Sequence, residues 1–165
     1  SNFSVDSSRR LICSRLARKK CTVAVIDAWE THGRGQRAGY THLLSLVADL
    51  SVAQKGTVEQ VLGDRMVITF NVSKANSSHN VSAVKFMVDL LHAWSESEKS
   101  KHVRLHAAAL SLTAYCGTWG SRSIMLGDGL DVCGAMLRLA AERRTDFPLV
   151  ETALYEQLQN TYSCR

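Results

Sequence analysis

The 165-residue chain has a single proline and no apolar run near the roughly 18 residues that a membrane-spanning helix needs. The missing run excludes a transmembrane segment. The chain also lacks an initiator Met and a signal peptide, so we expect it to be a piece of a longer protein. With 45% hydrophobic residues, its composition is that of an ordinary globular domain large enough for one core.

The cysteines lack a C-x-x-C pair, and their odd number argues against a complete disulfide framework. The five are Cys13, Cys21, Cys116, Cys133 and Cys164. Three of them lie in apolar stretches, which is typical of buried free thiols in a reducing compartment. We therefore expect a cytoplasmic domain, or the cytosolic part of a membrane protein.

The net charge of +5 is concentrated at one end of the chain. Residues 1–20 contain six Arg or Lys residues and one acidic residue, whereas residues 21–165 carry 14 basic and 14 acidic residues. The basic excess therefore belongs to this leading segment and not to a face of the domain, and nucleic acid is not an expected partner. Residues 1–20 are interpreted as a basic connector of the kind found beside membranes, and residues 21–165 as a single domain.

Hydrophobic periodicity predicts an alternation of strands and helices in the domain. Strands are expected at 21–29, 58–62, 66–70, 102–117 and 147–151, and helices at 39–54, 81–94, 129–144 and 152–159. The order β-α-β-β-α-β, followed by a further helix and strand, predicts an α+β fold. Its core would be ferredoxin-like, a mixed sheet with helices packed on it.

The stretch GTVEQVLGDRMVITF contains two apolar runs that meet at Gly63 and Asp64. Gly63 can adopt positive φ and Asp64 tolerates turn geometry, so the pair predicts a tight hairpin. The alternation of residues on each side predicts two strands with one buried face. Asp64 is then either a simple turn residue or, beside the strand-end acid Asp27, part of a site for divalent metal.

Several segments together resemble class III nucleotidyl cyclases, the adenylyl and guanylyl cyclases. These segments are VAVIDAW, GTVEQVLGDRMVITF, YCGTWG, LGDGLDVCGAMLRLAAE and FPLVETALYEQL, in the order and spacing of that family. The resemblance implies that Asp27 and Asp64 hold two Mg²⁺ or Mn²⁺ ions, assisted by the carbonyl of Ile26. Two such ions would activate the attacking ribose oxygen and neutralise phosphate charge.

The positions that would contact the nucleotide depart from the family pattern. Gln60 stands where the family has a base-recognising Lys or Glu, and Ile124 replaces the second base contact. The segment AWETH follows Asp27 in place of a phosphate-cradling Ile-x-Gly-Phe-Thr, and Thr31 is its candidate contact. Glu30 in the same segment would repel a triphosphate unless it too ligated the metal ions.

The helix expected at 129–144 departs from the family as well. Asp131 stands at the position of the family's Asn, and Ala135 at the position of the Arg that stabilises the transition state. Losing an arginine of this kind costs on the order of 10³-fold or more in rate. Arg138, three residues further, could replace it only through a shift of register.

Three interpretations follow. The first is a catalytically inactive cyclase-homology domain, a pseudoenzyme that serves as a dimerisation and regulatory module of a larger protein and binds ATP or GTP as a ligand. The second is the metal-bearing subunit of an active heterodimeric adenylyl or guanylyl cyclase, whose partner supplies Asn and Arg. The third is a purely structural protein-interaction domain. The family acts as head-to-tail dimers, so a homodimer or a heterodimer with another cyclase-like domain is expected, in a parent protein attached to a membrane.

Overall fold

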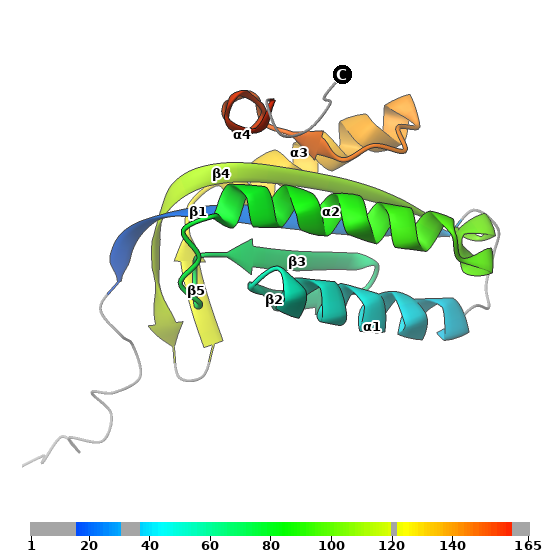
Figure 1. Cartoon of the computed structure of the whole chain (residues 1–165), viewed down its shortest axis with the longest axis horizontal. Helices are drawn as coiled ribbons and strands as arrows, with labels where there is room; N and C mark the ends of the chain where they lie inside the picture. The colour runs from blue at the N-terminus through cyan, green and yellow to red at the C-terminus, as the bar shows by residue number, and fades with distance from the viewer. Residues whose placement is uncertain (1–15, 31–36, 120–121, 160–165) are drawn as a thin grey trace, which may run out of the picture.

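The computed structural model describes residues 16–30, 37–119 and 122–159. These residues form strands, helices and one 3₁₀ helix in an order that Figure 1 shows from blue to red. The elements are β1 (Ala17–Glu30), α1 (Arg37–Ala53), β2 (Gly56–Leu62), β3 (Arg65–Phe70), α2 (His79–Ser95), η2 (Glu98–Lys101), β4 (Val103–Trp119), β5 (Arg122–Leu126), α3 (Gly129–Arg143), β6 (Leu149–Val150) and α4 (Thr152–Leu158).

In the described part of the chain the strands form one sheet of six, ordered β2-β3-β1-β4-β5 with β6 beside β4. The pairs along the main order are antiparallel, and β6 runs parallel to β4. The order β2-β3-β1-β4 is that of a ferredoxin-like core. The expected α+β fold with a βαββαβ core is therefore confirmed, extended by β5, α3, β6 and α4.

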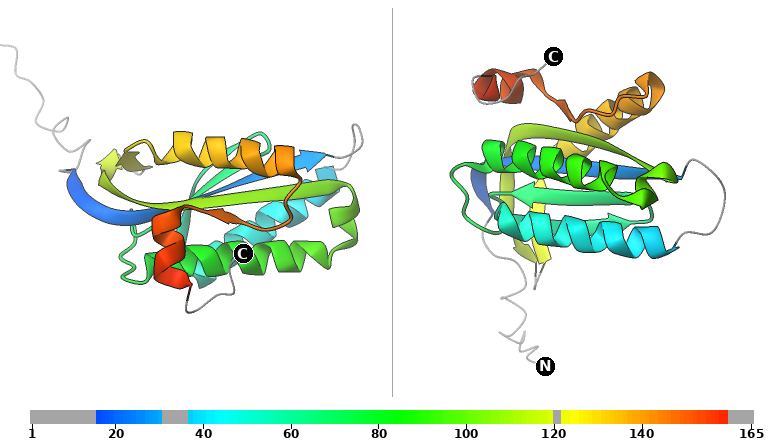
Figure 2. Two further views of the ribbon diagram at one scale, coloured as in Figure 1. Left: turned by 90° about the horizontal axis from the view of Figure 1, so that it is seen from above. Right: turned by 45° about the vertical axis from the view of Figure 1, so that its right-hand side comes forward.

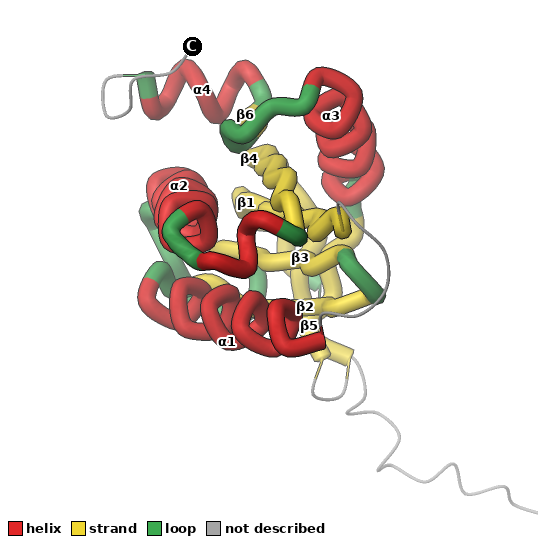
Figure 3. The backbone as a smooth tube through the Cα atoms, turned by 90° about the vertical axis from the view of Figure 1, so that its right-hand side faces the viewer, coloured by secondary structure: helices red, strands yellow, loops and turns green. Residues whose placement is uncertain are grey.

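Helices cover both faces of the sheet. Figure 2 shows α1 and α2 on one face and α3 on the other, and Figure 3 shows the same layers end-on. The strand period of two divides β1 between these layers. Ala24, Ile26 and Ala28 pack toward α1 and α2, while Val23 and Val25 pack with Cys133 and Leu137 of α3.

The β2–β3 hairpin forms as predicted, but one expectation for its first strand is wrong. Met66, Ile68 and Phe70 of β3 are completely buried on one face, as their alternation predicts. In β2 the register shifts between Val58, which pairs with Ile68, and Gln60, which pairs with Val67. This β-bulge inserts Glu59, so Val58 faces α1 and α2 while Gln60 and Leu62 turn toward the opposite face.

The central strands are longer than the sequence predicts. The β1–β4 register runs without interruption from Ala17–Cys116 to Glu30–Val103, so β1 begins inside the expected basic connector. In Figure 1, β4 curves away from the helical layers toward β5, a strand that the sequence analysis missed. Within the described ranges, no helix combines the length and apolarity needed to cross a membrane.

Candidate functional site

Asp27 stands near the end of a central strand. It pairs with Arg65 of β3 on one side and with His106 of β4 on the other. Directly opposed residues in a sheet point to the same face, so the three side chains share the α3 side. Asp27 is 7% exposed, and a carboxylate buried to this degree needs a charged or hydrogen-bonding partner.

The hairpin tip brings Asp64 to the same end of the sheet. Gly63 has φ +58°, the left-handed value expected from the sequence, and its carbonyl accepts a hydrogen bond of 2.8 Å from the Tyr40 hydroxyl of α1. The backbone N–H of Ala28, next to Asp27, donates to the Asp64 carbonyl at 2.9 Å. The two acids thus lie at one end of adjacent strands, with Asp64 exposed.

The sequence analysis missed the residue that lies between them. Arg65 donates from Nε to Asp27 Oδ1 at 2.7 Å and from Nη2 to Asp27 Oδ2 at 2.6 Å. This is a bidentate, charge-assisted pair, among the stronger arrangements available to a guanidinium. The hydrogen bond with Asp27 raises the pKa of Arg65 above its ordinary value, and the charge of Asp64 acts in the same direction.

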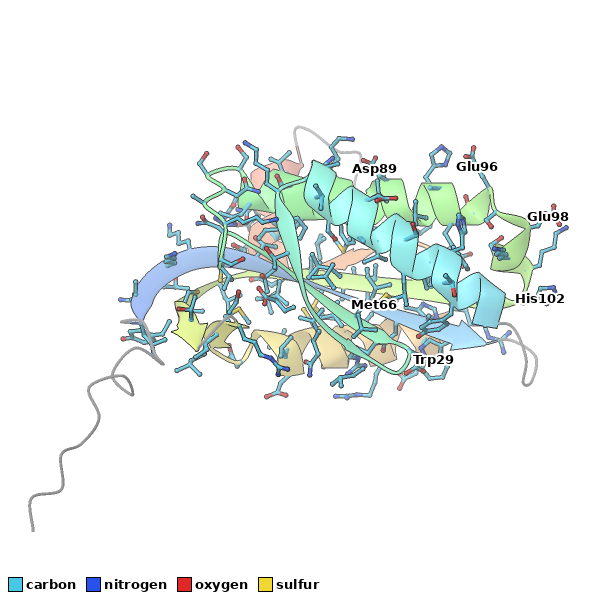
Figure 4. All side chains as sticks on the ribbon, turned by 90° about the horizontal axis from the view of Figure 1, so that it is seen from below. Trp29, Met66, Asp89, Glu96, Glu98 and His102 are labelled. Atoms are coloured by element: carbon cyan, nitrogen blue, oxygen red, sulfur yellow. The ribbon has the colours of Figure 1, made fainter. Side chains whose placement is uncertain are left out.

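His106 and Trp29 complete this end of the site. His106 is 4% exposed, and its Nδ1 has no hydrogen-bond partner among the residues that the structure describes. Burial lowers the pKa of His106, which keeps the imidazole neutral near pH 7. The Trp29 ring meets it edge-on at 6.4 Å between centroids, and Trp29 itself is 51% exposed. Figure 4 shows Trp29 at the end of β1, on the α3 side of the sheet.

Helix α3 lies over the guanidinium. A Cβ placed on Gly134 would lie 3.8 Å from Arg65 Nη1, an ordinary van der Waals distance. The neighbouring Cys133 is completely buried and free of disulfides, and burial raises its pKa to about 12. A thiol with this pKa stays protonated near neutral pH, so Cys133 carries no negative charge that would compete with Asp27 for Arg65.

The arrangement does not fit a divalent cation. Both carboxylate oxygens of Asp27 accept hydrogen bonds from Arg65, so a divalent ion bound to them would lie beside the positive charge of the guanidinium. Ile26 is completely buried inside the ladder, paired with Met66 and Ala107, so its carbonyl lies in the plane of the sheet. Among the described residues, no group of three His, Cys, Asp or Glu could hold a metal ion. The roles assigned to Asp27, Asp64 and Ile26 stay predictions.

The residues assigned to the nucleotide are not gathered in one place. Gln60 is exposed on the α3 side of the sheet, with β3 between it and β1. Ile124 pairs with Gly117, about 35 Å of strand along β4 from the His106 that faces Asp27. Thr31 lies outside the described residues. A single chain therefore does not assemble Asp27 and Ile124 into one site.

Helix α3 presents the remaining positions to solvent. Asp131, Ala135 and Arg138 are exposed, while Cys133, Gly134 and Leu137 face the sheet. The spacing i, i+4, i+7 places the first three on one stripe of the helix. Arg138 is thus on the same stripe as Ala135, about 4.5 Å further along the axis.

Comparison with known proteins agrees with this architecture. No protein-family profile and no curated protein sequence matches the chain. Solved structures match it. The dimeric guanylyl cyclase domain of the RhoGC fusion protein from Blastocladiella emersonii gives a TM-score of 0.71 at 12% identity, covering 89% of this chain and 86% of that one. The chain has the fold of the class III cyclase catalytic domains.

Two further structures span the family. The guanylate cyclase domain of RhGC from Catenaria anguillulae, in complex with GTP, has a TM-score of 0.72, 12% identity, and coverage of 87% of this chain and 84% of that one. The adenylyl cyclase CyaB from P. aeruginosa has a TM-score of 0.69, 17% identity, and coverage of 92% and 86%. The resemblance read from the sequence motifs is thereby confirmed for the cyclase fold.

Proposed function

We propose that this chain is a catalytically inactive cyclase-homology domain that acts as a dimerisation and regulatory module of a larger protein. The observation that carries the proposal is the exposed stripe of α3, where Asp131 and Ala135 occupy the positions that the resemblance gives to Asn and Arg. A methyl group cannot meet the charge that develops on a transferring phosphoryl group. Ala135 therefore removes the transition-state half of the chemistry.

The positions that the resemblance assigns to metal binding are altered as well, independently of α3. Arg65 holds both carboxylate oxygens of Asp27, and the exposed indole of Trp29 follows at the same strand end. A triphosphate carrying two divalent ions would meet a guanidinium already paired with the acid it needs. Two separate changes, on β3 and α3, thus act against cyclisation.

A role in association is supported by the surface of α3. Leu130, Val132 and Leu139 of this helix are each exposed by 37 to 42%, and Phe147 beyond its C-terminus is 70% exposed. Val132 and Leu139, at i and i+7, lie on one side of the helix and Leu130 on the opposite edge. Neighbouring exposed apolar side chains such as Val132 and Leu139 mark interaction surfaces more often than single exposed residues do. The RhoGC domain is monomeric in one crystal structure and a non-canonical dimer in another, and we extend its capacity to associate to this chain.

The direct test is an assay for cyclic nucleotide. The purified chain is incubated with ATP or GTP, each with Mn²⁺ or Mg²⁺, and the products are separated by chromatography and mass spectrometry. No cAMP or cGMP is expected above the level of a protein-free control. Product that forms with the wild-type chain and disappears in Asp27→Ala would contradict the proposal, because a contaminating cyclase would not respond to that substitution.

A second candidate function is the metal-bearing subunit of a heterodimeric cyclase. It is favoured by the position of Asp27 and Asp64 at one end of adjacent strands, joined through the Ala28–Asp64 backbone hydrogen bond. Mixing the chain with a cyclase domain that keeps its Asn and Arg but lacks its metal aspartates tests this. Product that depends on Asp27 would establish the heterodimer, and its absence supports the inactive module.

A further inference from the structure

The chemistry expected at Asp27 and the residues found there disagree. The cyclase resemblance assigns a divalent cation to this carboxylate, whereas the structure places a side-chain cation against it. Arg65 Nε and Nη2 lie at 2.7 and 2.6 Å from the two carboxylate oxygens. We propose that Arg65 is a resident replacement for the divalent ion, which neutralises Asp27 and excludes Mg²⁺ and Mn²⁺ from the site.

The position of Arg65 is fixed by the sheet. It is the first residue of β3 and pairs directly with Asp27 in the β1–β3 register. The hairpin before it is held by the Tyr40–Gly63 and Ala28–Asp64 hydrogen bonds, so the strand cannot slide without breaking both. A Cβ built on Gly134 would lie 3.8 Å from Arg65 Nη1, so α3 passes close to the guanidinium on this face of the sheet.

Charge and geometry act together in the exclusion. The bidentate pair occupies one lone pair on each oxygen of the carboxylate, so a hard cation could bind Asp27 only beside the guanidinium. A divalent ion that approached would be repelled by the nearby guanidinium at a short distance inside a partly buried site. The second acid does not offset this, because Asp64 is exposed and its charge also acts on Arg65.

This inference rests on the proposed function, since it explains why the metal-binding positions of a cyclase site would not bind metal in this chain. The two can fail separately. Cyclic nucleotide made by the wild-type chain would overturn the proposed function, whereas the present inference is decided by metal binding alone, without nucleotide.

The test follows the electron paramagnetic resonance signal of free Mn²⁺ during titration of the full chain. Wild type and Asp27→Asn are expected to remove the same small amount of Mn²⁺ from solution. Arg65→Gln, which removes the charge, is expected to bind Mn²⁺ about tenfold more tightly or better, because a carboxylate is freed and a repelling cation is lost. The double variant Arg65→Gln/Asp27→Asn should lose that gain.

Two controls separate charge from disturbance. Arg65→Lys keeps the cation and should exclude Mn²⁺ as wild type does. Lys85→Ala removes the cation next to the exposed carboxylate of Asp89, its partner at 2.7 Å on α2, and should leave Mn²⁺ binding unchanged. Circular dichroism checks that each variant is folded.

The outcomes are decisive in both directions. Wild-type binding of Mn²⁺ that is lost in Asp27→Asn overturns the inference. So does a folded Arg65→Gln that binds no more Mn²⁺ than wild type. If Arg65→Gln does not fold, the comparison of wild type with Asp27→Asn still decides whether Asp27 holds a metal ion.

Discussion

At the scale of the residue, the site is defined by one ion pair. The Arg65 side chain is 42% exposed and that of Asp27 only 10%, so the acid depends on the pair more than the base does. Removing one partner leaves a largely buried carboxylate with no charge partner, which costs more than losing an exposed salt bridge. The pair therefore contributes to stability as well as to the exclusion of metal.

Replacing Arg65 by Ala is expected to lower the free energy of unfolding by about 1–3 kcal/mol, because the carboxylate of Asp27 stays buried without its donors. Urea denaturation followed by circular dichroism measures this. The matched control Lys85→Ala breaks an exposed pair at i, i+4 on α2 and should cost less than about 0.5 kcal/mol. Equal effects of the two substitutions would show that the Arg65–Asp27 pair behaves as a surface salt bridge.

A second buried polar cluster lies at the start of α2. The Thr22 hydroxyl donates to Asn80 Oδ1 at 2.6 Å, and the ring of His79 contacts the same hydroxyl oxygen at 2.7 Å through Nδ1. Because the hydroxyl has only one proton to donate, Nδ1 of His79 carries the proton of that contact. Burial, with a contribution from Lys20, lowers the pKa of His79 below its ordinary value of 6.5.

The lowered pKa of His79 predicts a dependence of stability on pH. Below pH 6.5 the unfolded chain binds a proton more readily than the folded one. The stability contributed by neutral His79 is therefore complete above pH 6.5 and is lost as the pH falls through the folded pKa. The free energy of unfolding can fall by up to about 1.4 kcal/mol per pH unit in this window. Urea denaturation at successive pH values from 7.5 downward should show this loss beginning near pH 6.5.

The buried His106, with a pKa lowered in the same direction, adds a second contribution of the same sign. The variant His79→Asn keeps a side-chain hydrogen-bond donor but removes the titrating ring. It should therefore reduce the pH dependence of stability, and His106 should supply the slope that remains. A slope that His79→Asn does not alter would contradict the assignment.

At the scale of the element, the β2–β3 hairpin carries both the site and its most crowded packing. Gly56 begins β2 opposite Phe70 of β3. A Cβ built on Gly56 would lie 2.7 Å from Phe70 Cε1, too close for any real contact. Phe70 cannot retreat, because it is completely buried and packs against Phe86 with ring centroids 5.9 Å apart.

Gly56→Ala is expected to destabilise the domain by about 1–3 kcal/mol through this overpacking. Gly39 provides the control, because a Cβ there meets nothing nearer than 3.9 Å and the residue lies in α1. Gly39→Ala should stabilise by about 0.5–1 kcal/mol through helix propensity. Thermal unfolding of both variants measures the opposite signs, and a neutral Gly56→Ala would mean that Phe70 has room to move.

The elements also show what the sequence could predict. The turn at Gly63 and Asp64 was predictable because glycine supplies positive φ locally, and Met66, Ile68 and Phe70 were predictable from their alternation. The bulge at Glu59 and strand β5 were not predictable, because their geometry depends on pairing with distant strands. Arg65 was missed for the same reason: which residue of β1 it opposes is set by a register between strands that no local pattern encodes.

At the scale of the whole molecule, the two halves expected of a cyclase site lie apart. Asp27 is near the end of β1, and Ile124 lies on β5 at the far part of the long, curved β4. Asp131 and Ala135 lie on the outward stripe of α3. This separation fits a site formed between two copies, as the sequence resemblance implies, so association through the α3 surface is the property we expect the domain to retain.

Analytical ultracentrifugation is expected to show self-association of the wild-type chain. Leu139→Glu places a charge on the apolar surface of α3 and should weaken the association about tenfold or more, because the charge would be buried in the interface. Val52→Glu makes the same change at a valine that is 68% exposed on α1 and should have no effect. Equal association of the two variants would show that the interface does not involve Leu139 of α3.

The central claim is that the chain keeps the cyclase fold without the metal-dependent chemistry of the site. Calorimetric titration with ATP and with GTP, each in Mn²⁺, in Mg²⁺ and in a chelator, tests it most directly. The account predicts that no nucleotide binding depends on either metal and that Asp27→Ala/Asp64→Ala changes nothing in the titration. Nucleotide binding that requires Mn²⁺ or Mg²⁺ and is lost in this double variant would contradict it.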